Sequence, residues 1–447
     1  MRLIAVALML LIAAGSTPAR DLAGPSAHEF LYTKARTYEP LAWMQGGDRF
    51  ASSATIFLTD HAGIRALIPS FASSADPDLS FDGKRVLFAG KQTAKDHWQV
   101  WEIGLGSNTP RRITNCTDDC VRPFYLPEER IVYAERIGKQ FAIRSIGLDA
   151  TRPLSLTYGA SSYFPSDVLR DGRVLLEAIS PLGMPELYTV YSDGSGFESY
   201  RCDHGKPRQS GRQLASGDIV FASPGGLARF TSARATEIKV IVPSGEYAGD
   251  IAETSSGEWL IPWRKSRKEQ FQLMWWYPGA QTGLRSATQH PGFDLVQPVL
   301  LRERIVPNRH PSALHDWSYA NLLCLNAHVS REAFDDKAIQ SVRVYTRDDV
   351  GNIQLLGMAP VEADGSFYVQ TPGDQLLQME LLDGNGKTLR REQGWYWLRR
   401  GEQRACVGCH AGPETAPENA VPMILQKSTT PTALTHPTTQ VAAEAVR

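Results

Sequence analysis

Phe81-Asp82-Gly83-Lys84-Arg85-Val86-Leu87-Phe88 is the clearest copy of a pattern that recurs along the first two thirds of the chain. Each copy has a turn pair, then a charged residue, and then a short β-branched or aromatic run, which together predict a turn and a strand. Successive copies lie 40 to 46 residues apart, with Arg85 replaced in turn by Arg130, Arg173, Asp218, Glu258 and Arg304.

Most copies are followed by a second strand pair around another turn. After the first copy, for example, the run from Trp98 to Leu105 leads to Arg112-Ile113-Thr114. Four strands with a period of forty-odd residues are typical of one blade of a β-propeller. Six copies therefore predict six blades, whereas a large β-sandwich, the rival fold, predicts no such period.

The ends of the repeat region predict how the ring closes. The sixth copy, at residues 302–306, has no outer strand pair after it, and the N-terminal region holds an orphan pair at residues 54–59 and 63–68. We expect these strands to pair with the sixth copy, because a closed ring leaves no exposed sheet edge. Over residues 50–310 the pattern resembles the six-bladed TolB-like propellers.

From about residue 320 the pattern changes. Short alternating runs at residues 342–346, 353–356 and 363–369, and a hairpin over residues 376–398, predict a small antiparallel β-sandwich over residues 320–425. The predicted fold class is therefore all-β, with an N-terminal propeller followed by this sandwich. Residues 426–447 are rich in Thr, Pro and Ala and are expected to be a disordered tail.

The segment Cys406-Val407-Gly408-Cys409-His410 is the attachment motif of c-type haem. In such a motif the thiols of Cys406 and Cys409 bind the porphyrin vinyl groups, and His410 is the proximal iron ligand. Half of a zinc site or a redox dithiol is the alternative. Zinc needs two further ligands at matching spacing, and the chain has no second Cys-x-x-Cys and no His-x-x-x-His. We therefore expect one covalent haem c.

Several stretches around the motif are similar to one family. They are Gly357 to Phe367, Leu381-Leu382-Asp383, Glu392 to Trp397, Arg404 to His410 and Pro417-Glu418-Asn419. They resemble the hydrazine synthase alpha-subunit middle domain and its homologues. The resemblance implies a β-domain that carries covalent haem with an atypical iron environment. Because the chain lacks that enzyme's second haem domain, hydrazine synthesis is not expected.

The sixth iron ligand stays open. The candidate side chains are His328, Met358, Met379 and Met423. A His or Met ligand would make a low-spin electron carrier, and an open position would permit small-molecule chemistry. For each candidate, an ordinary surface His or core Met is the alternative.

Other residues near the motif have possible haem contacts. The resemblance implies that Cys324 lies near the haem, and a buried thiol without such a role is the alternative. Arg404, together with Arg399 and Arg400, is a candidate partner of the haem propionates, or else a solvated loop charge. The run from Trp395 to Trp397 alternates on a predicted strand, so one of its faces is a candidate porphyrin contact.

Three cysteines lie in the propeller region. Cys116 and Cys120 flank Thr-Asp-Asp in a loop between blades, and the sequence leaves a disulfide and two free thiols open. Cys202 lies in a similar loop, and no partner for it is evident.

Residues 1–19 have the charged start, apolar run and small-residue end of a secretory signal peptide. No later segment is apolar enough to span a membrane, so we expect a soluble, periplasmic or otherwise exported protein. The net charge of −1 gives no reason to expect nucleic acid binding. The oligomeric state stays open.

Three functions are compatible with these features. The first is periplasmic electron transfer with a redox partner protein, for which the propeller is a docking scaffold. The second is a haem redox enzyme that acts on a small nitrogen or oxygen species. The third is an interaction module in which haem only stabilises or senses.

Overall fold

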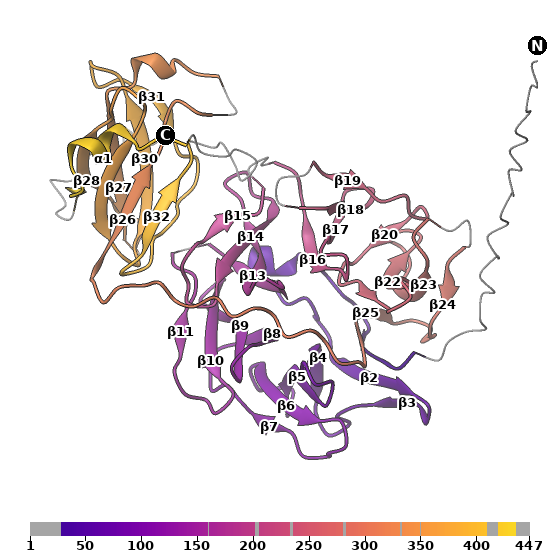
Figure 1. Cartoon of the computed structure of the whole chain (residues 1–447). Helices are drawn as coiled ribbons and strands as arrows, with labels where there is room; N and C mark the ends of the chain where they lie inside the picture. The colour runs from indigo at the N-terminus through magenta and orange to yellow at the C-terminus, as the bar shows by residue number, and fades with distance from the viewer. Residues whose placement is uncertain are drawn as a thin grey trace, which may run out of the picture.

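The computed structural model describes residues 28–159, 161–201, 205–232, 236–279, 283–330, 333–348, 350–408 and 419–434. Within these residues the chain forms six propeller sheets and, beside the propeller, a sandwich of two sheets (Figure 1). The predicted fold class is confirmed.

Blades one to four each contain four antiparallel strands that run from the propeller axis outwards. Blade one has β4 (Ser73–Leu79), β5 (Arg85–Lys91), β6 (Gln99–Gly104) and β7 (Arg111–Arg112). Blade two has β8 (Cys120–Leu126), β9 (Arg130–Ile137), β10 (Gln140–Gly147) and β11 (Leu154–Ser155). Blade three has β12 (Tyr163–Val168), β13 (Arg173–Ile179), β14 (Pro185–Tyr191) and β15 (Glu198–Ser199). Blade four has β16 (Gln209–Gln213), β17 (Ile219–Ser223), β18 (Gly226–Phe230) and β19 (Ile238–Lys239).

Blades five and six depart from this scheme. In blade five, β20 (Glu246–Tyr247) and β21 (Ala252–Glu253) share the innermost place beside β22 (Trp259–Arg264), followed by β23 (Gln272–Trp276) and β24 (Arg285–Ser286). Blade six combines β25 (Asp294–Leu300) with three N-terminal strands, β1 (Phe30–Ala35), β2 (Ala54–Asp60) and β3 (Gly63–Ala66).

The predicted ring closure is confirmed for the N-terminal strands β2 and β3, and it is wrong for the C-terminal strand with which they share the blade. Residues 302–306, the sixth copy of the repeat, form no strand, and the innermost strand β25 ends before them. The second strand of blade six is β1, which pairs with β25 on one side and β2 on the other. The ring is thus closed by one strand from the end of the propeller region, β25, and three strands from its beginning.

The repeat pattern marks the turn into the second strand of a blade. Gly83 and Gly172 both have positive φ (70° and 89°) in these turns, which glycine adopts without steric cost. A side chain at Gly172 would also collide with the backbone of Asn308, because its Cβ would lie 2.3 Å from the carbonyl oxygen. These turns therefore lie directly beneath residues 301–318, which we call the strap.

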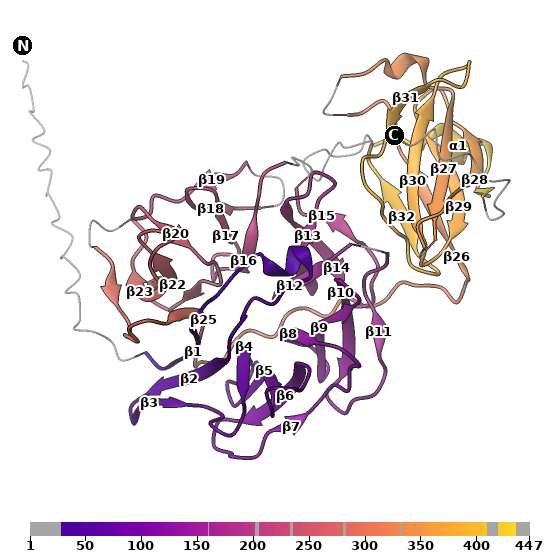
Figure 2. The same cartoon turned by 180° about the vertical axis from the view of Figure 1, so that it is seen from behind.

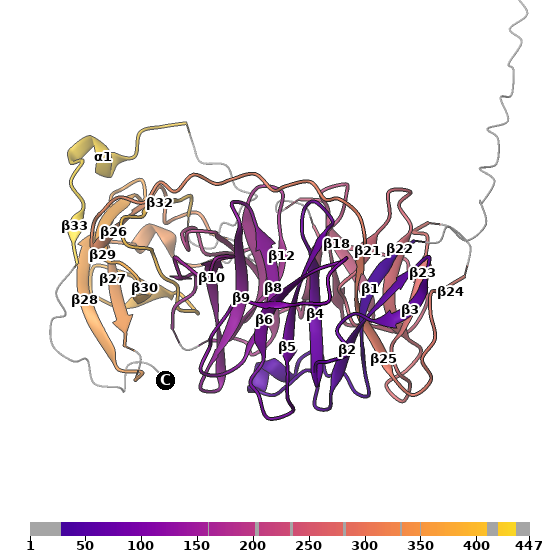
Figure 3. The same ribbon diagram turned by 90° about the horizontal axis from the view of Figure 1, so that it is seen from below.

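Both faces of the propeller are covered. The strap crosses the middle of one face on its way to the sandwich (Figures 1 and 3), and the His310 ring stacks on Tyr191 at 3.6 Å. The opposite face is covered by residues 36–53, which we call the plug and which contain the 3₁₀ helix η1 (Ala42–Gln45; Figure 2). Trp43 of the plug is buried and stacks on Phe164.

The propeller axis is filled by a ring of polar residues, four from the innermost strands and Asp250 from the link between β20 and β21. Asp76, Arg122, Ser210, Asp250 and Gln297 occupy equivalent positions and all have positive φ, between 52° and 56° for four of them and 58° for Arg122. Four of these positions coincide with a shift of strand register, as expected for a β-bulge.

Ion pairs connect this ring across the axis. Arg122 makes two hydrogen bonds to Asp250, at 2.7 and 2.9 Å, and Arg49 of the plug makes two to Asp76. All four side chains are almost completely buried. The axis of the propeller is therefore filled by paired, buried side chains.

The C-terminal unit consists of two four-stranded sheets. One sheet has the order β32 (Gln403–Cys406), β26 (Tyr319–Cys324), β29 (Phe367–Pro372) and β33 (Thr432–Ala433). The other has the order β31 (Thr388–Arg391), β30 (Leu376–Leu382), β27 (Ser341–Arg347) and β28 (Ile353–Pro360). The short helices η2 (Asp336–Ala338) and α1 (Met423–Lys427) complete the unit. Apolar side chains from both sheets form its core.

Three details of this unit differ from expectation. The pairs β26–β32 and β29–β33 are parallel, so only the second sheet is antiparallel throughout. The tail predicted to be disordered from residue 426 instead includes β33, and Leu434 is buried in the core. The run from Trp395 to Trp397 is not a strand; it contributes one isolated bridge, from Tyr396 to Leu377.

Two predicted segments, the signal peptide at residues 1–19 and the tail from residue 435, lie outside the described residues. In the part of the chain that the structure describes, no helix is long and apolar enough to cross a membrane.

Candidate functional site

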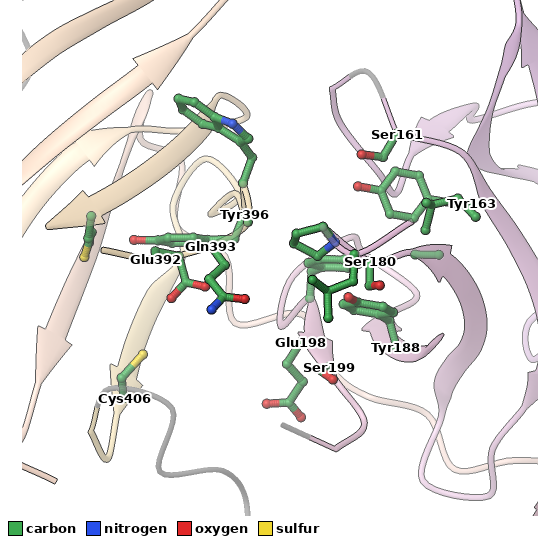
Figure 4. Close-up of a pocket in the computed structure, with 18 of the residues that line it drawn as sticks. Ser161, Tyr163, Ser180, Tyr188, Glu198, Ser199, Glu392, Gln393, Tyr396 and Cys406 are labelled. Carbon is green, nitrogen blue, oxygen red and sulfur yellow. The ribbon is translucent and has the colours of Figure 1, made fainter. Parts of the chain in front are cut away.

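A cavity of about 920 Å³ lies between the propeller and the sandwich (Figure 4). This volume falls within the range of about 300–1,000 Å³ that is typical of small-molecule and cofactor sites. Both units contribute to its wall, and apolar atoms make up the larger part of the lining.

The sandwich contributes the apolar end of the cavity. The two sheets separate between their edge strands, β32 and β31, so that core side chains of both sheets face the cavity. They are Leu322, Val342, Phe367, Met379 and Leu381. Arg390 from β31 and Arg404 and Cys406 from β32 flank this opening. Such an opening suits a flat apolar group with charged substituents.

The propeller contributes a wall that is rich in hydroxyl groups. Ser161, Tyr163, Ser180, Tyr188 and Ser199, all from blade three, lie across the cavity from Tyr396 and Cys406 (Figure 4). Burial raises the pKa of the Tyr163 hydroxyl, so this group stays protonated and can donate a hydrogen bond. Lys139 and Met44, from blade two and the plug, extend the same wall.

The first residues of the haem motif lie in the cavity wall. Cys406 ends β32, and its side chain is directed towards Glu392 and Gln393 at the cavity (Figure 4). Gly408 also lines the cavity, and a Cβ at this position would lie 2.7 Å from the carbonyl oxygen of Val329. Cys409 and His410 lie outside the described residues, so the structure does not place the second thioether or the proximal ligand.

These residues fit a covalently attached haem. Cys406 is in position to bind a vinyl group, and the apolar end between the sheets matches the porphyrin face. Arg404 and Arg390 supply positive charge for the propionates at the same opening. Within the described residues, two groups of side chains could hold a metal ion, Cys116 with Cys120 and Glu135, and His97 with Asp118 and Asp119, and both belong to blades one and two of the propeller.

Cys324 lies beside the first cysteine of the motif, and its predicted proximity to a haem stays a prediction. In the parallel pairing of β26 and β32, Cys324 and Cys406 are register partners, and both line the cavity. Cys324 is 2% exposed.

The candidates for the sixth iron ligand differ in their position relative to the cavity. Met379 lines the cavity, whereas His328, Met358 and Met423 do not. The Nδ1 atom of His328 lies 2.8 Å from the carbonyl oxygen of Asp336, and Met358 is 47% exposed on the far edge strand, β28. Met379 is therefore the candidate of this group with the best position.

The three arginines before the motif have different surroundings. Arg404 lines the cavity and donates a hydrogen bond to the carbonyl oxygen of Phe197 in blade three. Arg399 is bound to Asp374 and to blade three, and Arg400 is largely exposed beside the same Asp374. Of the three, only Arg404 faces the space in which propionates would lie.

The aromatic run divides between the cavity and the domain interface. Trp395 and Tyr396 line the cavity. Trp397 is 1% exposed and packs on blade three, with its ring 3.9 Å from that of Phe197. The predicted porphyrin contact is thus reasonable for Trp395 or Tyr396 and not for Trp397.

The propeller cysteines are resolved in part. Cys116 and Cys120 form a disulfide at the start of β8, an alternative that the sequence left open. Cys202 lies outside the described residues.

Sequence reasoning missed the whole propeller wall. Its residues, from Ser161 to Ser199, contain no motif, and their hydroxyl groups are brought together only by the packing of blade three against the sandwich. The resulting site is a cavity shared between a propeller and a β-sandwich, with the first cysteine of the Cys-x-x-Cys-His motif in its wall.

Comparison with known proteins finds one family model that matches part of the chain. Residues 325–411 match the model of the family described as hydrazine synthase alpha subunit middle domain, so the resemblance inferred from the sequence is confirmed for this segment. No curated protein matches the chain.

Two solved structures show the range of fold similarity. Hydrazine synthase from Kuenenia stuttgartiensis is 16% identical, with a TM-score of 0.78 over 90% of this chain and 72% of that chain. This likeness shows that propeller and sandwich are arranged similarly in both proteins. TolB from Acinetobacter baumannii is 13% identical over 61% of this chain and 66% of that one, with a TM-score of 0.38.

Proposed function

We propose that this protein is an exported, monohaem c-type redox protein whose haem lies in the cavity between propeller and sandwich. The observation that carries the proposal is the position of Cys406: the first cysteine of the attachment motif is in the wall of a cofactor-sized cavity. When bound, the haem supplies one-electron transfer and an iron site for a small ligand.

The residues of the chain have distinct roles in this proposal. Cys406 and Cys409 hold the haem covalently, and His410 is the proximal ligand. The core side chains of both sheets that line the cavity would exclude water from the haem. Arg404 binds a propionate, and the blade-three hydroxyls, led by Tyr163, donate hydrogen bonds to a small molecule beside the haem.

The geometry favours chemistry on a small molecule over simple electron transfer. If the propeller were only a docking scaffold, its side chains would not be needed at the haem, yet blade three supplies polar groups to the cavity wall. The fold shared with hydrazine synthase makes a small nitrogen species a reasonable substrate class. A small oxygen species is the alternative substrate class.

Electron exchange with a partner protein is the second candidate function, and one observation favours it. Cys406 is partly exposed on β32, which is an edge strand, so this attachment point is accessible from the surface. We propose that a redox partner delivers electrons there. Export is supported by the signal-like residues 1–19 and by the disulfide between Cys116 and Cys120, which is typical of oxidising compartments.

The test is to produce the full chain in an exporting host with c-type haem maturation and to measure haem that survives denaturation. We expect one covalently bound haem per chain in the wild type and a loss of stable double attachment in Cys406→Ala. If the haem iron has an open position for a small ligand, CO should shift the absorption spectrum of the reduced protein. A low-spin spectrum unchanged by CO would leave electron transfer as the function, and absence of covalent haem in the wild type would overturn the proposal.

A further inference from the structure

The segment that leads to the haem motif makes several contacts between the sandwich and the propeller. Four side chains of this segment, Trp397, Arg399, Glu402 and Arg404, contact blade three. We call these four residues the clamp. Cys406 follows two residues after the clamp ends, on the same short strand as Arg404.

Arg399 makes the densest set of clamp contacts. Its Nε donates a hydrogen bond to the carbonyl oxygen of Asp193 at 3.0 Å, and its Nη1 donates to the Tyr158 hydroxyl. The same Nη1 lies 2.6 Å from Asp374 in the sandwich. One guanidinium, with its side chain 11% exposed, thus joins a blade-three turn to a sandwich turn.

Glu402 joins the same two units through a buried carboxylate. Its Oε1 accepts a hydrogen bond from the backbone amide of Gly196 in blade three, at 3.2 Å. Its Oε2 accepts from the backbone amide of Arg399 at 2.7 Å, and Arg404 lies 3.3 Å from Oε1. The carboxylate therefore holds the bend of the clamp as well as the blade-three turn.

Blade three carries the clamp partners and the cavity wall on the same elements. Phe197 stacks on Trp397, accepts the hydrogen bond of Arg404 through its carbonyl oxygen, and lines the cavity. Tyr163 contacts Trp397 edge-on and also lines the cavity. A shift of the clamp would thus change the distance between Cys406 and the propeller wall.

We infer that the clamp fixes the position of the haem attachment strand relative to the propeller wall, and that Arg399 and Glu402 are positioning residues for the haem. This inference rests on the proposed haem site. Buried, hydrogen-bonded charges suit such a role, because removal of one partner leaves the other without compensation in a water-poor interface. Small displacements of reactive groups by remote residues are known to change rates by up to about a hundredfold.

The test compares Arg399→Gln with Arg400→Gln in the haem-loaded full chain. Arg400 is the matched control, because it is 65% exposed and, within the described residues, its hydrogen bond and its ion pair both go to Asp374 of the sandwich. We expect both variants to keep one covalent haem. Only Arg399→Gln should shift the midpoint potential of the haem. The same variant should also change the rate of CO association by roughly tenfold.

A second variant and a haem-free measurement keep the inference testable if Arg399→Gln folds poorly. Glu402→Gln retains an acceptor for Gly196 but loses the charge beside Arg404, so it should produce a smaller change of the same kind. In haem-free protein, hydrogen exchange of the β32 amides should be faster in both clamp variants than in Arg400→Gln.

The outcomes separate this inference from the proposed function. If the wild type carries covalent haem but both clamp variants match Arg400→Gln in potential, CO rate and amide exchange, the clamp inference is wrong. If the wild type carries no covalent haem, the proposed function fails, and the exchange of the β32 amides alone decides whether the clamp holds this strand.

Discussion

Gly408, within the haem motif, lies against the loop that follows β26. A Cβ at this position would be 2.7 Å from the carbonyl oxygen of Val329 and 3.1 Å from that of Asn326. The backbone amide of Leu325 also donates a hydrogen bond to Cys406, at 2.8 Å. The motif is thus held by backbone contacts that its sequence alone does not reveal.

Gly408→Ala should therefore weaken both the fold of the sandwich and haem attachment. Overpacking against backbone that cannot yield costs about 1–3 kcal/mol. Urea denaturation and the covalent haem content of the purified protein measure the two effects. Gly106→Ala is the control, because a Cβ at that position meets nothing within 4 Å. Equal stability and haem content in the two variants would contradict the packing argument.

Glu177 is a buried carboxyl group beside the polar ring of the propeller axis. Burial raises its pKa to about 7, against the opposing effect of Arg122 and of the hydrogen bond from the Ser210 amide. Asp250 contributes a further increase of this pKa, and Arg49 a decrease. The folded state thus binds the Glu177 proton more tightly than the unfolded state does.

This difference predicts how stability depends on pH. The stabilising contribution of the bound proton is fully present below the unfolded pKa, near 4.5, and is lost as the pH rises through about 7. Glu177→Gln keeps an acceptor for the Ser210 amide but cannot ionise. We expect the variant to gain stability relative to the wild type between pH 5 and pH 8, by up to about 3 kcal/mol. If the free energies of unfolding of the wild type and of Glu177→Gln change in parallel between pH 5 and pH 8, Glu177 does not titrate in this range.

At the scale of elements, the regular strands were predictable and the irregular ones were not. The second strands of blades one to five follow turn pairs and charged residues, so the repeat located them. The strand β1 has no such turn before it, and the sequence assigned its place in blade six to residues 302–306. These residues belong to the strap, where the backbone of Arg304 donates to Phe81 in blade one.

The strand β33 was missed because its surroundings are rich in Thr, Pro and Ser, a composition typical of disordered tails. Its position is explained by Leu434, which is 4% exposed and fills the space left by Gly357 on β28. A single apolar side chain, together with pairing to β29, thus orders a segment of polar composition.

Leu434→Ala should destabilise the sandwich by about 2–5 kcal/mol, because a buried leucine is replaced by a cavity. Thermal or urea unfolding of the full chain measures this loss. Val421→Ala, at a position that is 64% exposed, is the control and should change stability by less than about 0.5 kcal/mol. A Leu434→Ala variant as stable as this control would mean that β33 does not contribute to the core.

At the scale of the whole molecule, the two units make one site. The sequence predicted the propeller, the sandwich and the cysteine motif, each from a local pattern. It did not predict the cavity, because the wall residues Tyr163 and Tyr188 are more than 200 positions from Cys406. Which of the predicted haem contacts reach the cavity, such as Cys324 and Arg404, depends on the same domain packing.

The central claim is that an attached haem faces the propeller wall, and CO association with the reduced protein tests it most directly. Ser161 lines the cavity but is exposed, so Ser161→Trp should fold and narrow the cavity from the propeller side. Ser107→Trp, at an exposed site in blade one, is the control.

We predict covalent haem in the wild type and in both variants, with CO association slowed by roughly tenfold or more only in Ser161→Trp. If Ser161→Trp and Ser107→Trp bind CO at the same rate as the wild type, the propeller does not face the haem.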